Sequence, residues 1–268
     1  MQRALDSINE QIIAAVKRRA PEIAAASRGL PIRLVAVSKL KPTSSIIEAY
    51  ECGQRYFGEN YIQELETKSN SEDIIKHCPD IKFHFIGHLQ SNKVPKLLKV
   101  RNLNAIETID SIKLADLIDK AIDKHKNDKL TCGEKLSFAD QLDDRLRVFI
   151  QVNTSGEEAK NGVEPNEAPK LAEHIVGKCR WLHLVGLMTI GRYDGWGTDS
   201  GPNKDFVSLF ETRNLVAQHL SVEANDLELS MGMSGDFEEA IELGSTNVRV
   251  GSKIFGERPP KGGAVSAT

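Results

Sequence analysis

The run IRLVAVS (residues 32–38) stands directly before Lys39, and Pro42 follows where the first turn of a helix would begin. A mainly apolar run of this length predicts a strand that is covered on both faces, which is typical of a parallel sheet. Residues 43–52 then carry a helical pattern that ends at Gly53. The stretch therefore predicts one strand–helix unit, with Lys39 at the end of its strand.

The same unit recurs along the rest of the chain. We predict further strands at 56–59, 82–88, 104–110, 147–153, 182–190, 227–233 and 247–256, and further helices at 60–77, 91–99, 111–125, 166–178, 204–220 and 237–244. Alternating strands and helices imply a parallel sheet. Eight units in 268 residues favour a single closed (β/α)8 TIM-type barrel. An open doubly wound sheet is the alternative, but no Gly-x-Gly-x-x-Gly follows the first strand, as a dinucleotide fold would require.

Two segments interrupt this alternation. The polar residues 126–144 are expected to form an exposed loop or a helix extension. Residues 191–203 are rich in Gly, Asp and Ser and predict a long loop, in which Tyr193 and Trp196 are either part of the site or only surface residues.

The N-terminal residues predict an additional amphipathic helix that covers part of the outside of the barrel, because apolar side chains recur there at helical spacing. Its apolar face is expected to carry Leu5, Ile8, Ile12, Ile13 and Val16. The segment also contains acidic residues and lacks the continuous apolar core of a secretion signal. We therefore expect one domain over residues 1–258 and a disordered tail over residues 259–268.

Composition indicates an ordinary soluble protein. The chain is 40% hydrophobic and 27% charged, with a formal net charge of −3, which favours neither nucleic acid nor a membrane surface as a partner. No apolar run reaches the roughly 18 residues of a membrane span. The four cysteines, at 52, 78, 132 and 179, form no C-x-x-C, so neither a metal site nor a disulfide framework is expected. The expected location is cytoplasmic, and an organellar form made from a longer precursor stays open.

Chemistry is expected at the C-terminal ends of the strands, where parallel barrels carry their active sites. Lys39 ends the first strand after a mainly apolar run, so its amine would start from a poorly solvated base. Desolvation lowers the pKa of a lysine, which favours imine formation, and the charge of Lys41 would lower it further. The alternative is a strand-end lysine whose side chain extends to water.

Two loops near the other end of the sequence predict a phosphate site. Ser234 stands among small residues between a strand and a helix, and Gly251 and Ser252 follow the last strand. Barrels often bind phosphate with the loops after strands seven and eight, through backbone N–H groups and helix N-termini. For each loop alone, the alternative is that its glycines only form turns and its serine only caps a helix. In a closed ring, both loops lie close to the first strand. A phosphorylated aldehyde or a sugar-phosphate ketone could then reach from Lys39 to these loops.

The amino-acid sequences of the motifs distinguish the phosphorylated aldehyde from the sugar-phosphate ketone. VAVSKLKPTSSIIEAYECGQRYFGENYIQEL, FHFIGHLQSNK, VGLMTIG and LSMGMSGDFEEAIELGSTNVRVGSKIFGER resemble, in this order, the motifs of the pyridoxal 5'-phosphate (PLP) homeostasis proteins. These proteins are relatives of the N-terminal barrel of bacterial alanine racemase. The resemblance covers about residues 32–258 and implies a fold-type III PLP-binding barrel whose cofactor is PLP.

The resemblance also implies roles for single residues. Lys39 would carry PLP as a Schiff base, and Ser234, Gly251 and Ser252 would contact the phosphate. Arg249 would lie near the pyridine nitrogen. Because an arginine does not give up its proton, that nitrogen would stay unprotonated and PLP would be a weaker electron sink.

Further candidates come from strand positions. Asn60 ends the second strand, where it either faces the cofactor or caps the next helix. His84 and His88 are four residues apart on the predicted third strand and hence on one face, with His88 nearer the barrel mouth. Met188 and Met231 either pack around the cofactor ring or fill the core.

The implied function is PLP binding without established turnover, in the homeostasis of vitamin B6 and amino acids. The residues after the eighth strand are too few for the second β domain that completes the site of barrel-type racemases and decarboxylases, so a monomer is expected. PLP-dependent apo-enzymes and free amino acids are the expected partners besides PLP. A PLP-dependent amino-acid racemase is one alternative function, and a Schiff-base aldolase without a cofactor is another.

Overall fold

A computed structural model describes residues 1–27, 31–129, 145–157, 160–192 and 201–257. The strands are β1 Arg33–Val37, β2 Tyr56–Glu59, β3 Lys82–Phe85, β4 Leu103–Ile109, β5 Leu146–Gln151, β6 Leu182–Met188, β7 Glu228–Ser230 and β8 Asn247–Val250. The α-helices are α1 Gln2–Lys17, α2 Pro21–Ala26, α3 Thr43–Glu51, α4 Ile62–Ser69, α5 Glu72–His77, α6 Val94–Leu97, α7 Ile112–Lys129, α8 Ala168–Lys178, α9 Lys204–Leu220, α10 Phe237–Glu242 and α11 Ser252–Phe255, with short 3-10 helices at Ser91–Lys93 and Ala224–Asp226.

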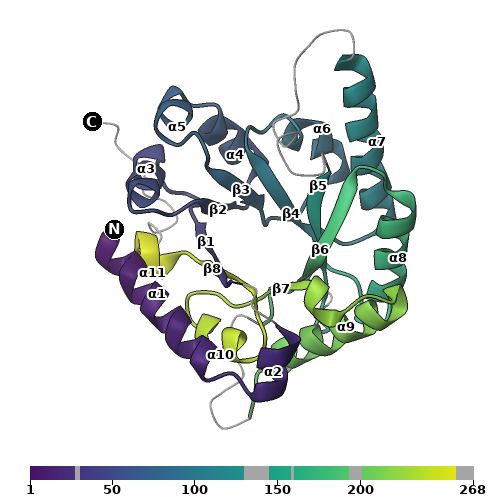
Figure 1. The fold of residues 1–268 in the computed structure, drawn as a ribbon. Coiled ribbons are helices and arrows are strands. Elements are labelled where there is room, and N and C mark those ends of the chain that lie inside the picture. Colours follow the sequence, from purple (N-terminus) through teal and green to yellow (C-terminus); the bar gives the residue numbers. More distant parts are fainter. Residues whose placement is uncertain (28–30, 130–144, 158–159, 193–200, 258–268) are drawn as a thin grey trace.

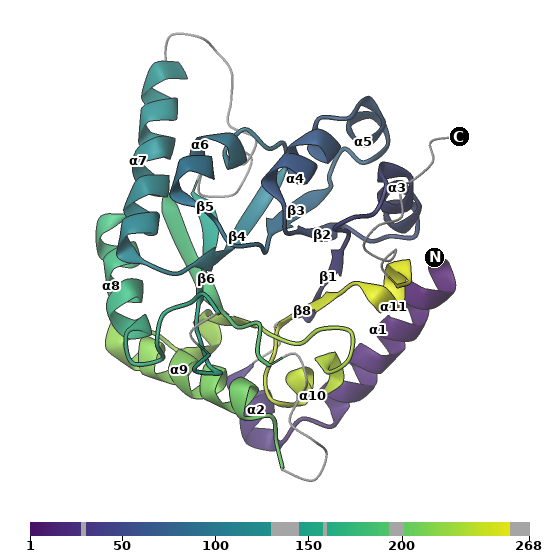
Figure 2. The ribbon, with the colours of Figure 1, turned by 180° about the vertical axis from the view of Figure 1, so that it is seen from behind.

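The eight strands form a closed parallel barrel in sequence order. Closure is made by β1 and β8, where Arg33 pairs with Asn247 and Ala36 with Val250. The helices surround the strands as a ring, which is visible from both sides of the molecule (Figures 1 and 2). The predicted (β/α)8 barrel is therefore confirmed, and the open doubly wound sheet is wrong.

Several predicted elements end earlier than expected. The third strand stops at Phe85 instead of residue 88, and the seventh stops at Ser230. Residues 252–255 leave the last strand and form the short helix α11. The predicted helix over 60–77 is divided into α4 and α5, because the Ser71 hydroxyl accepts the N–H of Ile74 and starts a new helix.

The N-terminal helix α1 lies beside α10 and α11 on the outside of the barrel (Figures 1 and 2). Its buried residues are Leu5, Ile8, Ile12 and Ala15. Ile13 and Val16 were expected on the same face but are 56% and 39% exposed. The apolar stripe of α1 is therefore narrower than predicted, since α1 covers the barrel on one side only.

Other expectations fall on residues that the structure does not describe. These are the segment at 130–144, the loop residues Tyr193 and Trp196, and the tail at 259–268. Within the described residues, no helix combines the length and the apolar composition that crossing a bilayer requires.

Candidate functional site

A cavity of about 440 Å³ opens at the C-terminal rim of the barrel. Residues at or after the C-terminal ends of six of the eight strands line it, which agrees with the position of active sites in such barrels. The lining residues are Val37, Lys39, Lys41, Asn60, Ile86, Met188, Ile190, Met233, Ser234, Gly235, Asp236, Arg249, Gly251, Ser252 and Gly256. Six of the eight predicted site residues are thus brought together, namely Lys39, Asn60, Ser234, Arg249, Gly251 and Ser252.

Lys39 is half-buried at the end of β1, and hydrogen bonds fix the chain on both sides of it. On one side, the hydroxyl of Ser38 donates to Glu59 Oε1 at 2.6 Å. On the other side, the N–H of Leu40 donates to Glu64 Oε1 at 2.6 Å. Leu40 has a φ of +61°, a value that a leucine rarely adopts and that these contacts maintain. The backbone that carries the Lys39 amine is therefore held in place.

Lys68 connects these contacts from below. Its ammonium donates to the carbonyl of Ser38 at 2.7 Å, to Glu59 Oε1 at 2.7 Å and to Glu64 Oε1 at 2.6 Å. The side chains of Lys68 and Glu59 are 7% and 0% exposed. Burial raises the pKa of Glu59, and the neighbouring ammonium and hydroxyl offset part of this rise. Lys68 is thus the main group that opposes the rise in the pKa of Glu59.

The loops after β7 and β8 form one wall of the cavity. The N–H of Gly251 donates to the Ser234 hydroxyl at 3.1 Å, which joins the two loops. Within the described residues, the N–H groups of Ser234, Gly235 and Ser252 have no acceptor, so they remain available to an anion. This wall can hold a phosphate.

The loop after β7 depends on one glycine. Gly232 has a φ of +93°, and a Cβ at this position would lie 2.5 Å from Ala240 Cβ. Only glycine meets both conditions without a shift of the neighbouring chain. Gly232 therefore lets the loop turn sharply against α10 and bring Ser234 to the cavity.

Arg249 lies at the bottom of the cavity and is 4% exposed. Its guanidinium donates to the Ser230 hydroxyl at 2.6 Å and to the carbonyl of Thr189 at 2.7 Å. Burial lowers the pKa of Arg249, while the charges of Glu107 and Asp236 act in the opposite direction. A guanidinium has five N–H groups, so donors remain for a ligand above it.

Glu107 holds the network beneath Arg249 together in the interior of the barrel. It accepts hydrogen bonds from Ser230 at 2.5 Å and Asn247 at 2.9 Å, and it lies 2.5 Å from the ring of His84. Although burial acts to raise its pKa, the contacts with His84, Arg249 and Ser230 lower the pKa of Glu107 to about 2. This carboxylate therefore stays ionised and opposes the positive charge of Arg249.

Asn60 provides a separate test of whether a ligand fits. Its Oδ1 atom is buried and has no hydrogen-bond partner within the described residues. A buried acceptor without a partner costs free energy unless a ligand or water satisfies it. An amine, an anion-binding wall, a guanidinium and a free acceptor thus surround one cavity, and together they fit a phosphorylated aldehyde with a polar ring.

Two predicted site residues lie elsewhere. His88 does not line the cavity, and its side chain, 48% exposed, lies 3.8 Å from Asp110. The reason is that β3 ends at Phe85, so the alternation that placed His88 beside His84 no longer holds. Met231 is fully buried in the main hydrophobic core. Because Ser230 faces the barrel interior, the next residue faces outward.

Lys41 lines the cavity, but its ammonium is bound elsewhere. It donates to the carbonyl of Phe255 at 2.7 Å and to those of Gly256 and Glu257 at 3.3 and 3.0 Å. These carbonyls lie at and directly after the C-terminal end of α11, where a cation is favourable. Lys41 therefore fixes the end of α11 in addition to any effect on Lys39.

Sequence reasoning missed several lining residues. Ile86, Ile190 and Met233 provide apolar surface, and Asp236 accepts the N–H of Met233 at 2.6 Å. The isoleucines follow the ends of β3 and β6, so strand position was a usable signal for them. Met188 lines the cavity, which agrees with the first of its two predicted positions, beside the cofactor ring.

Three comparisons place this geometry among known proteins. A family model for the alanine racemase N-terminal domain matches residues 12–259. The chain is 48% identical over 255 residues to the pyridoxal phosphate homeostasis protein of Homo sapiens, covering 95% of this chain and 86% of that protein. It is 43% identical to the protein of the same name from Caenorhabditis elegans, covering 96% and 99%.

A solved structure of PipY from Synechococcus elongatus with PLP bound is similar, with a TM-score of 0.62 and 29% identity. The match covers 90% of this chain and 100% of that one. The similarity therefore extends over most of this chain.

Proposed function

Because this chain belongs to the family of pyridoxal phosphate homeostasis proteins, we propose that it holds PLP in the rim cavity, as a Schiff base on Lys39. The observation that carries the proposal is that Lys39 lines the same cavity as the Ser234 loop and the Gly251–Ser252 loop. The amine and the anion-binding wall can then hold the two ends of one small molecule. PipY, with PLP bound, supports the choice of ligand.

Each group of residues would have its own task. Ser234, Gly251 and Ser252 would bind the phosphate through hydroxyl and backbone N–H groups. Asn60 would accept a hydrogen bond from the ligand, while apolar side chains such as Met188 would cover the ring and keep water from it. PLP, when bound, supplies an aldehyde that combines with amines and a ring that withdraws electrons.

Arg249 would lie beside the pyridine nitrogen. An arginine keeps its proton, and Glu107 stabilises this charged form from below. The ring nitrogen would then stay unprotonated, which weakens the ring as an electron sink. The site therefore favours holding PLP over stabilising a carbanion.

A carrier and a racemase differ in what they must do with the α-proton of an amino acid. A racemase needs an acid or base on each face of the cofactor. We infer that the protein stores PLP and exchanges it with free amino acids and PLP-dependent apo-enzymes, and that it acts as a cytoplasmic monomer.

The test is covalent trapping of the cofactor. The purified protein should be yellow, and reduction with borohydride should fix PLP on Lys39, as located by peptide mass spectrometry. Lys39→Ala should be colourless. Lys41→Met is the matched control, since Lys41 also lines the cavity but its ammonium is held by backbone carbonyls, and it should keep PLP on Lys39.

Three outcomes would contradict the proposal. A colourless wild-type protein that takes up no PLP would exclude PLP binding. Covalent PLP in Lys39→Ala would place the attachment on another residue. Rapid exchange of the α-proton of an amino acid with solvent would show a racemase-like enzyme instead of a carrier, and transfer of PLP to an apo-enzyme would then be a secondary property.

A further inference from the structure

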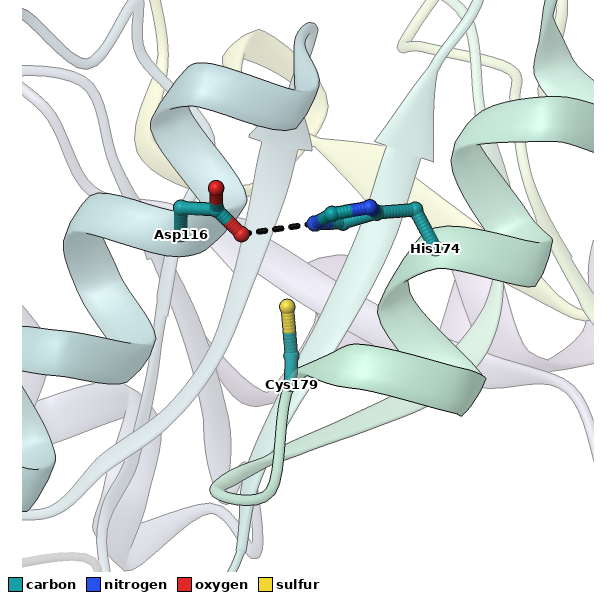
Figure 3. A group of neighbouring side chains, drawn as sticks. All are labelled: Asp116, His174 and Cys179. Atoms are coloured by element: carbon teal, nitrogen blue, oxygen red, sulfur yellow. Dashed lines mark hydrogen bonds and ion pairs between the residues drawn. The ribbon is translucent and has the colours of Figure 1, made fainter.

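A second group of chemically reactive side chains lies outside the barrel, between α7 and α8, and none of its residues lines the rim cavity. Asp116 projects from α7, His174 from α8, and Cys179 is the residue that ends α8 (Figure 3). His174 Nε2 lies 2.6 Å from Asp116 Oδ1. The Cys179 sulfur lies beside this pair and points toward both side chains (Figure 3). One ligand atom of each residue lies within 4.8 Å of the other two.

We propose that Asp116, His174 and Cys179 form a zinc-binding site that joins α7 to α8. A carboxylate oxygen, an imidazole nitrogen and a thiolate are the three donor types found in protein zinc sites. Hard cations such as Mg²⁺ and Ca²⁺ prefer oxygen donors alone, so the cysteine and the histidine select a borderline metal. Three protein ligands leave the fourth tetrahedral position to water.

The distances suit this metal after small side-chain rotations. Zinc bonds of about 2.0–2.3 Å in a tetrahedron separate the donor atoms by about 3.5 Å. The Asp116–His174 pair is 2.6 Å apart, and all separations within the group are at most 4.8 Å, so small rotations of these side chains bring the donor atoms to this spacing. His174 and Cys179 come from the same end of α8, so only the position of Asp116 depends on a second helix.

Access and charge also agree with a metal. The side chains of His174 and Asp116 are 23% and 37% exposed, so an ion can reach them from solvent, while Cys179 is 4% exposed beneath them. Asp119 adds a second negative charge near the thiol, which favours a cation at this place. Zinc binding would release the thiol proton to solvent and leave the sulfur as the ligand.

The sequence alone did not suggest this site, because the three ligands form no compact motif. His174 and Cys179 are five residues apart, but Asp116 comes from a helix 58 residues earlier. The site also differs from a histidine–carboxylate pair between α8 and α9. His219 of α9 and Glu173 of α8 lie 3.0 Å apart, but no cysteine is grouped with them among the described residues.

The experiment uses the full-length, tag-free, PLP-loaded protein after dialysis against a chelator. Co²⁺ should bind at one per chain and give the near-ultraviolet charge-transfer band of a cobalt thiolate, and Zn²⁺ should displace it. Cys179→Ser should abolish the band, and His174→Gln should weaken Zn²⁺ binding at least tenfold, as measured with a chromophoric competitor. Mg²⁺ should not compete.

Two variants serve as matched controls. Cys78→Ser removes another buried cysteine, and His219→Gln removes the histidine of the comparable pair; both should bind Zn²⁺ like the wild type. The proposal is overturned if the wild type gives no thiolate band, if the band persists in Cys179→Ser, or if His219→Gln loses as much affinity as His174→Gln. The cobalt spectrum of the wild type decides the question even if a variant folds poorly.

Discussion

Replacing Lys68 with methionine should test how the Lys39 segment is held. Methionine has a similar length but no charge, so the change removes three hydrogen bonds, to the Ser38 carbonyl, to Glu59 and to Glu64. The carboxylate of Glu59 would then keep only the Ser38 hydroxyl as a partner, because its Oε2 atom has none among the described residues. The variant therefore leaves a fully buried charge without its counter-ion.

The expected cost follows from this burial. Removing one member of a buried ion pair typically destabilises a protein by about 3–5 kcal/mol. In a chain of this size we expect the melting temperature to fall by roughly 6–20 °C. The matched control is Lys96→Met, whose pair with Glu66 has the same 2.7 Å separation but side chains that are 37% and 31% exposed. That change should cost less than about 1 kcal/mol.

The loss should also depend on pH. Burial already raises the pKa of Glu59, and removal of Lys68 would raise it further. A carboxyl with a raised pKa binds its proton more tightly in the folded state, so stability falls as pH rises through the folded pKa. The difference between Lys68→Met and the wild type should thus be smallest in acid, below the ordinary pKa of Glu59, and largest near neutral pH.

Urea unfolding, followed by circular dichroism at several pH values, measures these differences. The double variant Lys68→Met, Glu59→Gln should regain much of the lost stability, since the buried charge is gone. The explanation is refuted if Lys68→Met costs no more than Lys96→Met, or if the double variant is as unstable as the single one.

Three further changes test other parts of the site. Gly232→Ala should cost about 1–3 kcal/mol in urea unfolding, because φ is positive and the new Cβ would meet Ala240; a neutral result would contradict the described turn. Glu107→Gln should lower the free energy of unfolding most above pH 4.5, the ordinary pKa of a glutamate. The loss should decrease as pH falls toward the folded pKa of Glu107, about 2, and a loss in urea unfolding that does not change with pH would count against this. His88→Ala should leave the amount of borohydride-trapped PLP on Lys39 unchanged, and a clear decrease would return His88 to the site.

The barrel and the placement of Lys39 were predictable, because both depend on local patterns. Apolar runs that alternate with helical segments specify parallel strands, and the residue after such a run must lie at the C-terminal rim. Ser234, Gly251 and Ser252 followed from the same rule once the ring was closed. The cavity residues found in this way are those that come directly after a strand.

The positions of predicted site residues were uncertain where they depended on the residue at which a strand ends. Because β3 ends three residues earlier than predicted, His88 lies at the surface and not at the rim, while Met231 takes the second of its two predicted positions and fills the core. Contacts distant in sequence gave no signal at all. Glu107 meets Asn247 from 140 residues away, so the network beneath Arg249 becomes visible only when the barrel closes.

The two buried carboxylates under the cavity differ in a way that bears on how PLP would be released. Glu107 has several donors and a lowered pKa, so the charge beneath Arg249 persists down to strong acid. Glu59 has one oxygen without a partner among the described residues and a raised pKa, so it is the first of the two to take up a proton as pH falls. Neutral Glu59 would bind Lys68 less strongly, and Lys68 holds the carbonyl next to Lys39. Acidification should therefore loosen the Lys39 side of the cavity while the Arg249 side keeps its geometry.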